Sequence, residues 1–268
     1  MNKEEILKAF DLFYAQYNIS FNARFHRYSL DGVSCAGVST VSEYRSSPFL
    51  VPWAAKMVVE HLKDKQDIIK TATPEEYEAL LLEAKKMHKT KSEEAMEIGT
   101  RVHQFCQDWI EGKNPVAEED IKNPTSEFLK FEKEHKVEWV ATEKIVCSPA
   151  HLVAGRLDSI AFVDGILSLV DLKTSSSVRE SYYLQTAGYA MCLAEMGIPV
   201  DRRIILRLPK IAGDSFEAVE VDTELFDDIE GFLGQRRAYG WANMISVRFS
   251  DDVKVGKYKQ KQLRIKKI

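Results

Sequence analysis

Two strand-like runs on either side of the dipeptide Asp164-Gly165 constrain the fold of this chain most strongly. The runs, RLDSIAFV before the dipeptide and ILSLVDLK after it, have the length and apolar content of β-strands. Asp-Gly best accommodates the two positive φ angles of a type I′ turn, so the runs are expected to form a β-hairpin. Both faces of this hairpin carry apolar residues, which predicts a place at the centre of a sheet.

The predicted hairpin brings two acids and one lysine onto one face. A two-residue loop pairs Asp158 with Asp171 across the strands, and the alternation of side chains puts Lys173 on the same face as Asp171. Facing carboxylates destabilise a sheet, and burial adds a desolvation cost for both ions. A divalent cation would remove this conflict, and an all-oxygen site favours Mg²⁺ or Mn²⁺ over softer metals.

Such a group of side chains suits the hydrolysis of a phosphodiester. The cation would polarise a phosphoryl oxygen and lower the pKa of a bound water. Lys173 would orient or help deprotonate that water and offset charge on the phosphate. The alternative is a plain salt bridge between Asp158 and Lys173, with Asp171 as an exposed residue. Because that alternative leaves the second carboxylate unexplained, the sequence favours the metal-dependent site.

Periodicity and turn residues predict the other elements. A second hairpin is expected around Asp31-Gly32, from RFHRYSL to VSCAGVS, and VEWVATEKIVCS is expected as a single strand before the central hairpin. The order around the centre is then three strands, a helix at 180–196 and a further strand, DRRIILRL. Other helices are expected at 3–17, from Pro52 to about 63, at 73–88, at 92–112, after Asn123 and at 223–237, with a weaker strand at FEAVEV.

These elements predict an α/β fold with a mixed central β-sheet flanked by helices, extended by an N-terminal helical lobe and a small β-hairpin. Residues 1–95 are expected to form the hairpin and the helical lobe, and residues 96–245 the core with the acidic site. Residues 246–268 are expected to form a basic C-terminal tail. This division makes one main domain with an added lobe.

Composition narrows the class of protein. The net charge of −4 argues against binding of nucleic acid through overall charge alone. The segment from Lys254 to Ile268 carries seven Lys or Arg and no acid, which suits phosphate contact but is also typical of a solvated tail. The four cysteines lie more than forty residues apart, so free thiols are expected. Since the sequence has neither a long apolar run nor a secretory pattern, we expect a cytoplasmic protein.

The motifs AGRLDS, VDLKTSS and LQTAGYA follow one another along the chain. In order and spacing they resemble the motifs of the PD-(D/E)XK nuclease superfamily, in its RecB-like and phage-exonuclease branch. The resemblance implies a restriction-endonuclease-like fold in which Asp158 and Asp171 bind metal and Lys173 is catalytic. It also implies that the following helix supplies Gln185 and Tyr189 to the active site, although plain helix packing would explain this pair too.

An upstream helix supplies a further candidate ligand. EIGTRVHQF is similar to the GxxxH element of the same family, in which a helix-borne histidine completes the metal shell, and His103 is that residue here. A mid-helix histidine is also commonly a packed or solvent-facing residue. The resemblance further implies the backbone carbonyl of Leu172 as a ligand of one or two Mg²⁺ or Mn²⁺ ions, and Glu143 as a second-sphere or second-metal residue.

The first part of the chain is also similar to phage-encoded members of the family, through YSLDG, GVSTVSE and PWAAK. This similarity implies a helical cap, with Arg24, Arg27, Arg45 and Lys56 available for phosphate contact. It favours an exonuclease that acts on DNA ends in recombination or replication, in the cytosol of a bacterial host. A recombination or single-strand-binding protein is the expected partner. An endonuclease, an RNA-directed nuclease and a non-catalytic nucleic-acid-binding module remain alternatives.

Two further features limit the cofactors. No cysteine follows Cys192, so we expect no iron-sulfur cluster of the kind that some relatives hold through clustered late cysteines. The sequence also has no GxxxxGK[ST] phosphate loop, so no nucleotide-driven motor is expected.

Overall fold

A computed structural model gives the fold and describes residues 1–45 and 50–254, with side chains for all of these except 245–254. In chain order the elements are α1 (Lys3–Gln16), β1 (Ile19–Asn22), β2 (Arg27–Leu30), β3 (Val33–Gly37), α2 (Val38–Ser42), α3 (Leu50–Asp64), α4 (Gln66–Thr71), α5 (Pro74–Ile110), η1 (Glu119–Ile121), α6 (Lys122–Glu134), β4 (Val137–Thr142), β5 (Ile145–Ser148), β6 (Val153–Arg156), β7 (Ser159–Val163), β8 (Ile166–Lys173), α7 (Glu180–Glu195), β9 (Arg202–Arg207), β10 (Glu217–Glu220) and α8 (Leu225–Lys254).

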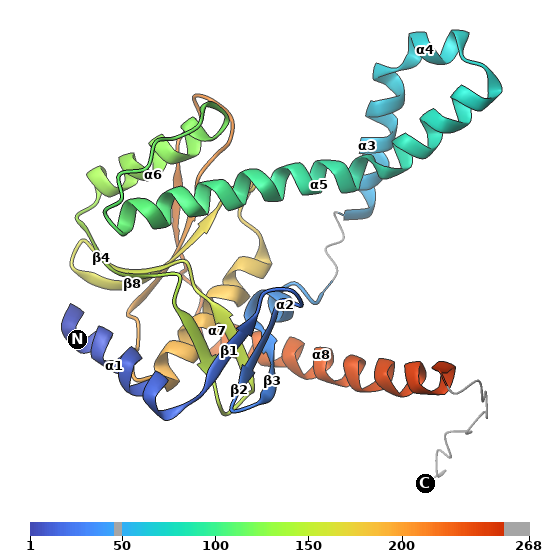
Figure 1. Cartoon of the computed structure of the whole chain (residues 1–268). Helices are drawn as coiled ribbons and strands as arrows, with labels where there is room; N and C mark the ends of the chain where they lie inside the picture. Colours follow the sequence, from blue (N-terminus) through green and yellow to red (C-terminus); the bar gives the residue numbers. More distant parts are fainter. Residues whose placement is uncertain (46–49, 255–268) are drawn as a thin grey trace.

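Two five-stranded sheets form the centre of the molecule. One has the strand order β1-β2-β3-β6-β5 and the other the order β10-β9-β8-β7-β4. Both are mixed, because β3 pairs with β6 in parallel and β8 pairs with β9 in parallel, whereas the other neighbours are antiparallel. Helices flank the sheets (Figure 1). The predicted α/β class, with mixed sheets flanked by helices, is therefore confirmed.

The central hairpin forms as its turn residues predict. Asp164 and Gly165 have φ angles of 53° and 83°, as a type I′ turn requires. The strands β7 and β8 pair from Val163 opposite Ile166 to Ser159 opposite Val170. This register is the one expected from a two-residue loop.

The two faces of this hairpin belong to different cores. Ile160, Leu167 and Leu169 pack in a cluster with residues of α1, α7 and α8. Val170 and Leu172 pack in a second cluster that includes Val102 and Phe105 of α5 together with residues of α6. The helices α5 and α6 thus cover one face of the central sheet, and α7 covers the other.

Two predicted strands were wrong in the same way. VEWVATEKIVCS is not one strand but two, since β4 ends at Thr142 and β5 begins at Ile145 in the other sheet. The run RLDSIAFV is likewise divided between β6 and β7, which belong to different sheets. The expected order of three strands before the helix is therefore replaced by five strands, from β4 to β8. The chain leaves one sheet for the other at both breaks.

The two helices predicted at 73–88 and 92–112 are a single helix, α5, of 37 residues. Its start carries a capping box, in which Thr73 and Glu76 exchange side-chain and backbone hydrogen bonds. Lys89 and Lys91 lie in the supposed gap, where they pair with Glu93 and Glu94 and continue the helix. The expected domain boundary at residue 95 lies inside this helix.

A helical arm extends from the body of the molecule (Figure 1). It consists of α3, α4 and residues 74–95 of α5, and neither α3 nor α4 has a buried residue. Within the described residues no helix is both long and apolar enough to cross a membrane.

The chain ends and the first hairpin also differ from the sequence expectations. The strand predicted as VSCAGVS ends at Gly37 because Val38 begins α2, and β1 was missed. The helix predicted at 223–237 continues to Lys254. The basic tail expected at 246–268 lies partly in this helix, and residues 255–268 are outside the described residues.

Candidate metal centre at the junction of the two sheets

The two breaks between sheets lie side by side and carry the acids Glu143 and Asp158. The N–H of Glu143 donates to the carbonyl of Asp158 over 3.0 Å, and the N–H of Leu157 donates to the carbonyl of Lys144 over 3.0 Å. Glu143 has a φ of 53°, in the left-handed region, which turns the chain from β4 towards β5. The backbone thus fixes both acids at the point where the strands change sheets.

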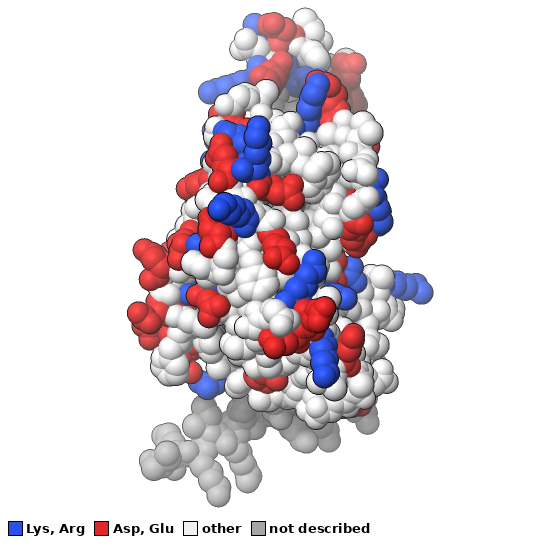
Figure 2. Space-filling view, turned by 90° about the vertical axis from the view of Figure 1, so that its left-hand side faces the viewer, with Lys and Arg blue, Asp and Glu red and all other residues white. Residues whose placement is uncertain are grey.

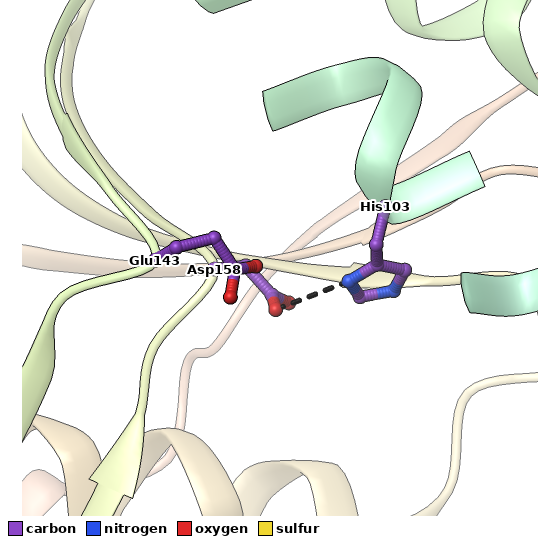
Figure 3. Close-up of side chains that lie close together, drawn as sticks. All are labelled: His103, Glu143 and Asp158. Atoms are coloured by element: carbon purple, nitrogen blue, oxygen red, sulfur yellow. Dashed lines mark ion pairs between the residues drawn. The ribbon is translucent and has the colours of Figure 1, made fainter. Parts of the chain in front are cut away.

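His103 reaches this junction from α5. Its Nδ1 lies 3.2 Å from Oδ1 of Asp158. Gly99, one turn earlier, allows the close approach of the helix, because a Cβ there would lie 3.2 Å from Oγ1 of Thr174, which follows β8. One ligand atom each from His103, Glu143 and Asp158 lie within 4.8 Å of one another. Figure 3 shows the three side chains pointing towards a common space.

Asp158 is held by a network of donors. Its Oδ2 accepts a hydrogen bond of 2.7 Å from the N–H of Leu172 on β8. Burial raises the pKa of Asp158, but His103, Lys173 and the Leu172 N–H outweigh it and hold that pKa below its usual range. Burial lowers the pKa of His103, and attraction to Asp158 more than offsets this, so the net shift is upward. Asp158 is therefore ionised at neutral pH and has charge to offer a cation.

Asp171 and Lys173 form a buried pair beside this group. Nζ of Lys173 lies 2.6 Å from Oδ2 of Asp171, whose side chain is only 1% exposed. Burial raises the pKa of Asp171 to about 6 against the attraction of Lys173. Burial disfavours charged Lys173, but Asp171 and Asp158 raise its pKa above the ordinary value, and its Nζ also lies 4.9 Å from the centroid of the Tyr182 ring. Lys173 therefore carries its proton.

The donors fit a hard divalent cation. The two carboxylates are the oxygen ligands that Mg²⁺ and Mn²⁺ prefer, and the imidazole adds a nitrogen ligand of the kind that transition metals such as Mn²⁺ accept. Among the described residues, neither oxygen of Asp171 accepts a hydrogen bond of good geometry, despite the ion pair with Lys173. A buried carboxylate with free lone pairs is a group that a metal or its water would satisfy.

The structure groups the predicted ligands differently from the sequence. Glu143, expected only as a second-sphere or second-metal residue on a strand, lies in a turn and belongs to the group with His103 and Asp158. Asp171 lies outside that group and faces Lys173 instead. At Leu172 the structure shows a role for the N–H, which binds Asp158, while the role of the carbonyl stays a prediction. The polar triplet at 142–144, inside an apolar run, is the signal that marks Glu143.

Gln185 and Tyr189 lie behind the acids. Tyr189 is buried, and its hydroxyl donates to the carbonyl of Arg156 over 2.7 Å. Nε2 of Gln185 donates to that hydroxyl over 3.5 Å. A Cβ on Gly155 would lie 2.8 Å from Cε1 of Tyr189, so only glycine admits the ring here. This pair supports the strand that leads into Asp158.

A cleft of about 640 Å³ opens beside Glu143. Residues of α1, β1 and the β4–β5 turn line it, among them Tyr14, Ile19, Lys144 and Glu143 itself. The hydroxyl of Tyr14 is already engaged, because it donates to the carbonyl of Ile145 over 2.7 Å. Of the candidate ligands only Glu143 lines this cleft, so the cleft lies next to the candidate centre and is not formed by it.

The described lysines and arginines do not gather into one continuous patch on the face shown in Figure 2. On this face they are interspersed with acids. Two of the four cations expected to contact phosphate pair with acids: Arg45 lies 3.8 Å from Glu180, and Lys56 lies 3.5 Å from Glu60.

No family model and no curated protein matches this chain. Among solved structures, an alkaline exonuclease, LHK-Exo from Laribacter hongkongensis, is similar over 56% of this chain and 85% of its own, with 8% sequence identity and a TM-score of 0.32. Because so low a TM-score shows neither fold nor activity, the residues of the site carry the functional conclusion.

Proposed function

We propose that this protein is a metal-dependent DNA nuclease of the PD-(D/E)XK type, which hydrolyses phosphodiester bonds at the junction of the two sheets. One observation carries the proposal: residues from three separate stretches of sequence converge, with donors of His103, Glu143 and Asp158 within 4.8 Å of one another. Lys173 and its buried partner Asp171 lie beside them, 2.6 Å apart. Metal ligands next to a charged amine are what phosphodiester hydrolysis needs.

Each residue has a proposed task. His103, Glu143 and Asp158 hold one or two Mg²⁺ or Mn²⁺ ions, with Asp171 and the carbonyl of Leu172 as further ligands. When bound, the cation supplies Lewis acidity towards a phosphoryl oxygen and a water. Lys173, which keeps its proton beside its acidic neighbours, donates a hydrogen bond that orients the attacking water and balances charge on the phosphate.

We propose that Gln185 and Tyr189 help to position Asp158. Tyr189 holds the carbonyl of Arg156, and this contact fixes the strand end that carries Asp158. Gln185 in turn orients the Tyr189 hydroxyl. Neither contact requires a direct approach to the substrate.

The finer proposal is an exonuclease that acts on DNA ends, of the phage type that serves recombination or replication. The resemblance of YSLDG, GVSTVSE and PWAAK to phage-encoded enzymes supports it. Such an enzyme would work in the cytosol of a bacterial host beside a recombination or single-strand-binding protein. Closed circular DNA tests this choice directly: an exonuclease leaves circles intact while it degrades the same DNA after linearisation, and cleavage of circles would show an endonuclease.

End-labelled linear DNA tests the nuclease itself. The purified protein with Mg²⁺ or Mn²⁺ is expected to degrade it, and EDTA or the variant Lys173→Ala should stop the reaction. Lys122→Ala, which removes an exposed lysine of α6, is the matched control and should cleave like the parent. If the parent cleaves DNA with neither metal, or if Lys173→Ala is as active as Lys122→Ala, the proposal is wrong.

A further inference from the structure

Arg156 connects the candidate centre to the first hairpin. It ends β6, two residues before Asp158, and its Nη1 lies 3.8 Å from Oε2 of Glu143. The same guanidinium lies 5.4 Å from the centroid of the Phe21 ring on β1. Its side chain is still 43% exposed. Arg156 therefore presents a positive charge to solvent at the edge of the metal-ligand group.

Aromatic rings continue outwards from Arg156 along the β1–β2 hairpin (residues 19–30). The ring of Phe21 lies 4.7 Å from that of Tyr28 and 5.2 Å from that of His26, between centroids. Ile19, on the same side of β1 as Phe21, lines the cleft together with Glu143. The hairpin thus borders the cleft that Glu143 also lines, and Figure 1 shows β1 and β2 below α5.

The tip of this hairpin exposes a phenylalanine among cations. Phe25 is 61% exposed, and the guanidinium of Arg24 lies 5.4 Å from the centroid of its ring. In the part of the chain that the structure describes, neither Arg24 nor Arg27 pairs with an acid, unlike Arg45 and many of the surface lysines. The cation–π contact of Arg24 with Phe25, with Arg27 two residues further along, therefore places an aromatic face and positive charge together at an exposed position.

We propose that the β1–β2 hairpin and Arg156 bind an unpaired DNA strand and lead it to the candidate metal centre, an inference that rests on the proposed nuclease function. Arginine charge suits the phosphates, and an exposed ring stacks on a base only where that base is unpaired. A duplex offers phosphates but keeps its bases stacked inside. The hairpin therefore selects a single strand over a duplex.

Binding without cleavage tests this proposal. The full chain in EDTA is titrated with a fluorescent oligothymidine and with a duplex of equal length, at several salt concentrations. Phe25→Ala should weaken binding of the single strand about tenfold through lost stacking, and Phe25→Trp should restore it. Arg156→Met should lower the slope of log Kd against log salt by about 0.7, the contribution of one phosphate contact in a single strand, while Arg156→Lys keeps the slope.

Two exposed residues far along the chain serve as matched controls. Phe226→Ala removes a ring that is 72% exposed, and Lys122→Met removes a charge from α6; both should bind the oligonucleotide like the parent. Unchanged affinity and slope in Phe25→Ala and Arg156→Met would overturn the proposal, as would equal affinity of the parent for duplex and single strand. Because EDTA prevents cleavage, this measurement reports binding alone. A parent protein that binds the oligonucleotide through the hairpin but cleaves no DNA would contradict the proposed nuclease function and leave the proposed binding by the hairpin intact.

Discussion

The sheet junction and the helical arm differ in how their charged side chains are held. At the junction, Asp171 is 1% exposed and Lys173 15% exposed in their pair, and Asp158 is bound at once by His103 and the backbone. In the arm, the pair of Lys91 and Glu94 is at least half exposed on both sides. Buried pairs resist separation because a lone buried charge is costly, whereas exposed pairs add little. We therefore expect the catalytic site at the junction, where the fold fixes the charged side chains.

The largest difference between the sheet junction and the helical arm should appear in nuclease activity. Asp158→Asn keeps the shape of the side chain but removes the charge that holds a cation, so we expect cleavage to fall at least about a thousandfold, the equivalent of several kcal/mol of lost transition-state stabilisation. Asp67→Asn, in an exposed pair of the arm, should stay within about twofold. Single-turnover cleavage of labelled DNA measures both. A tenth or more of the parent rate in Asp158→Asn would contradict the assignment.

Stability should differ between the two ends of the same helix. Phe105, near the junction end of α5, is buried in the core, and Phe105→Ala should lower the free energy of unfolding by about 3–5 kcal/mol. Leu82, in the arm, is 54% exposed, and Leu82→Ala should change it by less than about 0.5 kcal/mol. Urea denaturation compares them. Equal losses would mean that the arm is as closely packed as the core.

Substitution of glycine by alanine at two positions should give a smaller difference in stability. A Cβ on Gly155 would meet Tyr189 at 2.8 Å and Val38 at 3.0 Å, so Gly155→Ala should cost about 1–3 kcal/mol of stability through overpacking. Gly234 on α8 has no such neighbour within 4 Å. Gly234→Ala should therefore be neutral or stabilise by up to about 1 kcal/mol. Thermal unfolding of both variants checks the signs, and destabilisation of equal size would refute the close approach at Gly155.

The smallest effect is expected in the arm. Lys91→Met removes one exposed pair with Glu94 and should change the free energy of unfolding by no more than about 0.5 kcal/mol, less in high salt. Chemical denaturation at low and high salt measures this. A larger loss would show that the charge pairs of the arm act as a network.

Local sequence patterns predicted the central hairpin and its register. The Asp164-Gly165 turn fixes which residues face each other, and this information lies within eighteen consecutive residues. Local patterns could not predict that Glu143 joins His103 and Asp158. Glu143 reaches Asp158 because two strands change sheets at neighbouring positions, and this depends on pairings between distant segments, such as that of β3 with β6. Periodicity within one strand contains no such information.

Helix boundaries show the same limit. Thr73 and Gly112 mark the ends of α5 correctly, because capping and a positive φ are local properties. The supposed break between 88 and 92 reflects loss of apolar periodicity in a solvent-facing arm, where the helix needs no apolar face. Lysines and glutamates with good helix propensity continue it instead.

Calorimetric titration with Mn²⁺ tests the central claim, that the sheet junction holds a divalent cation. The parent protein should take up Mn²⁺ saturably, Asp158→Asn should abolish that uptake, and Glu143→Gln should weaken it. Glu132→Gln, which alters a carboxylate bound by two tryptophans away from the group, should bind Mn²⁺ like the parent. No uptake by the parent, or uptake that survives in Asp158→Asn, would contradict the account.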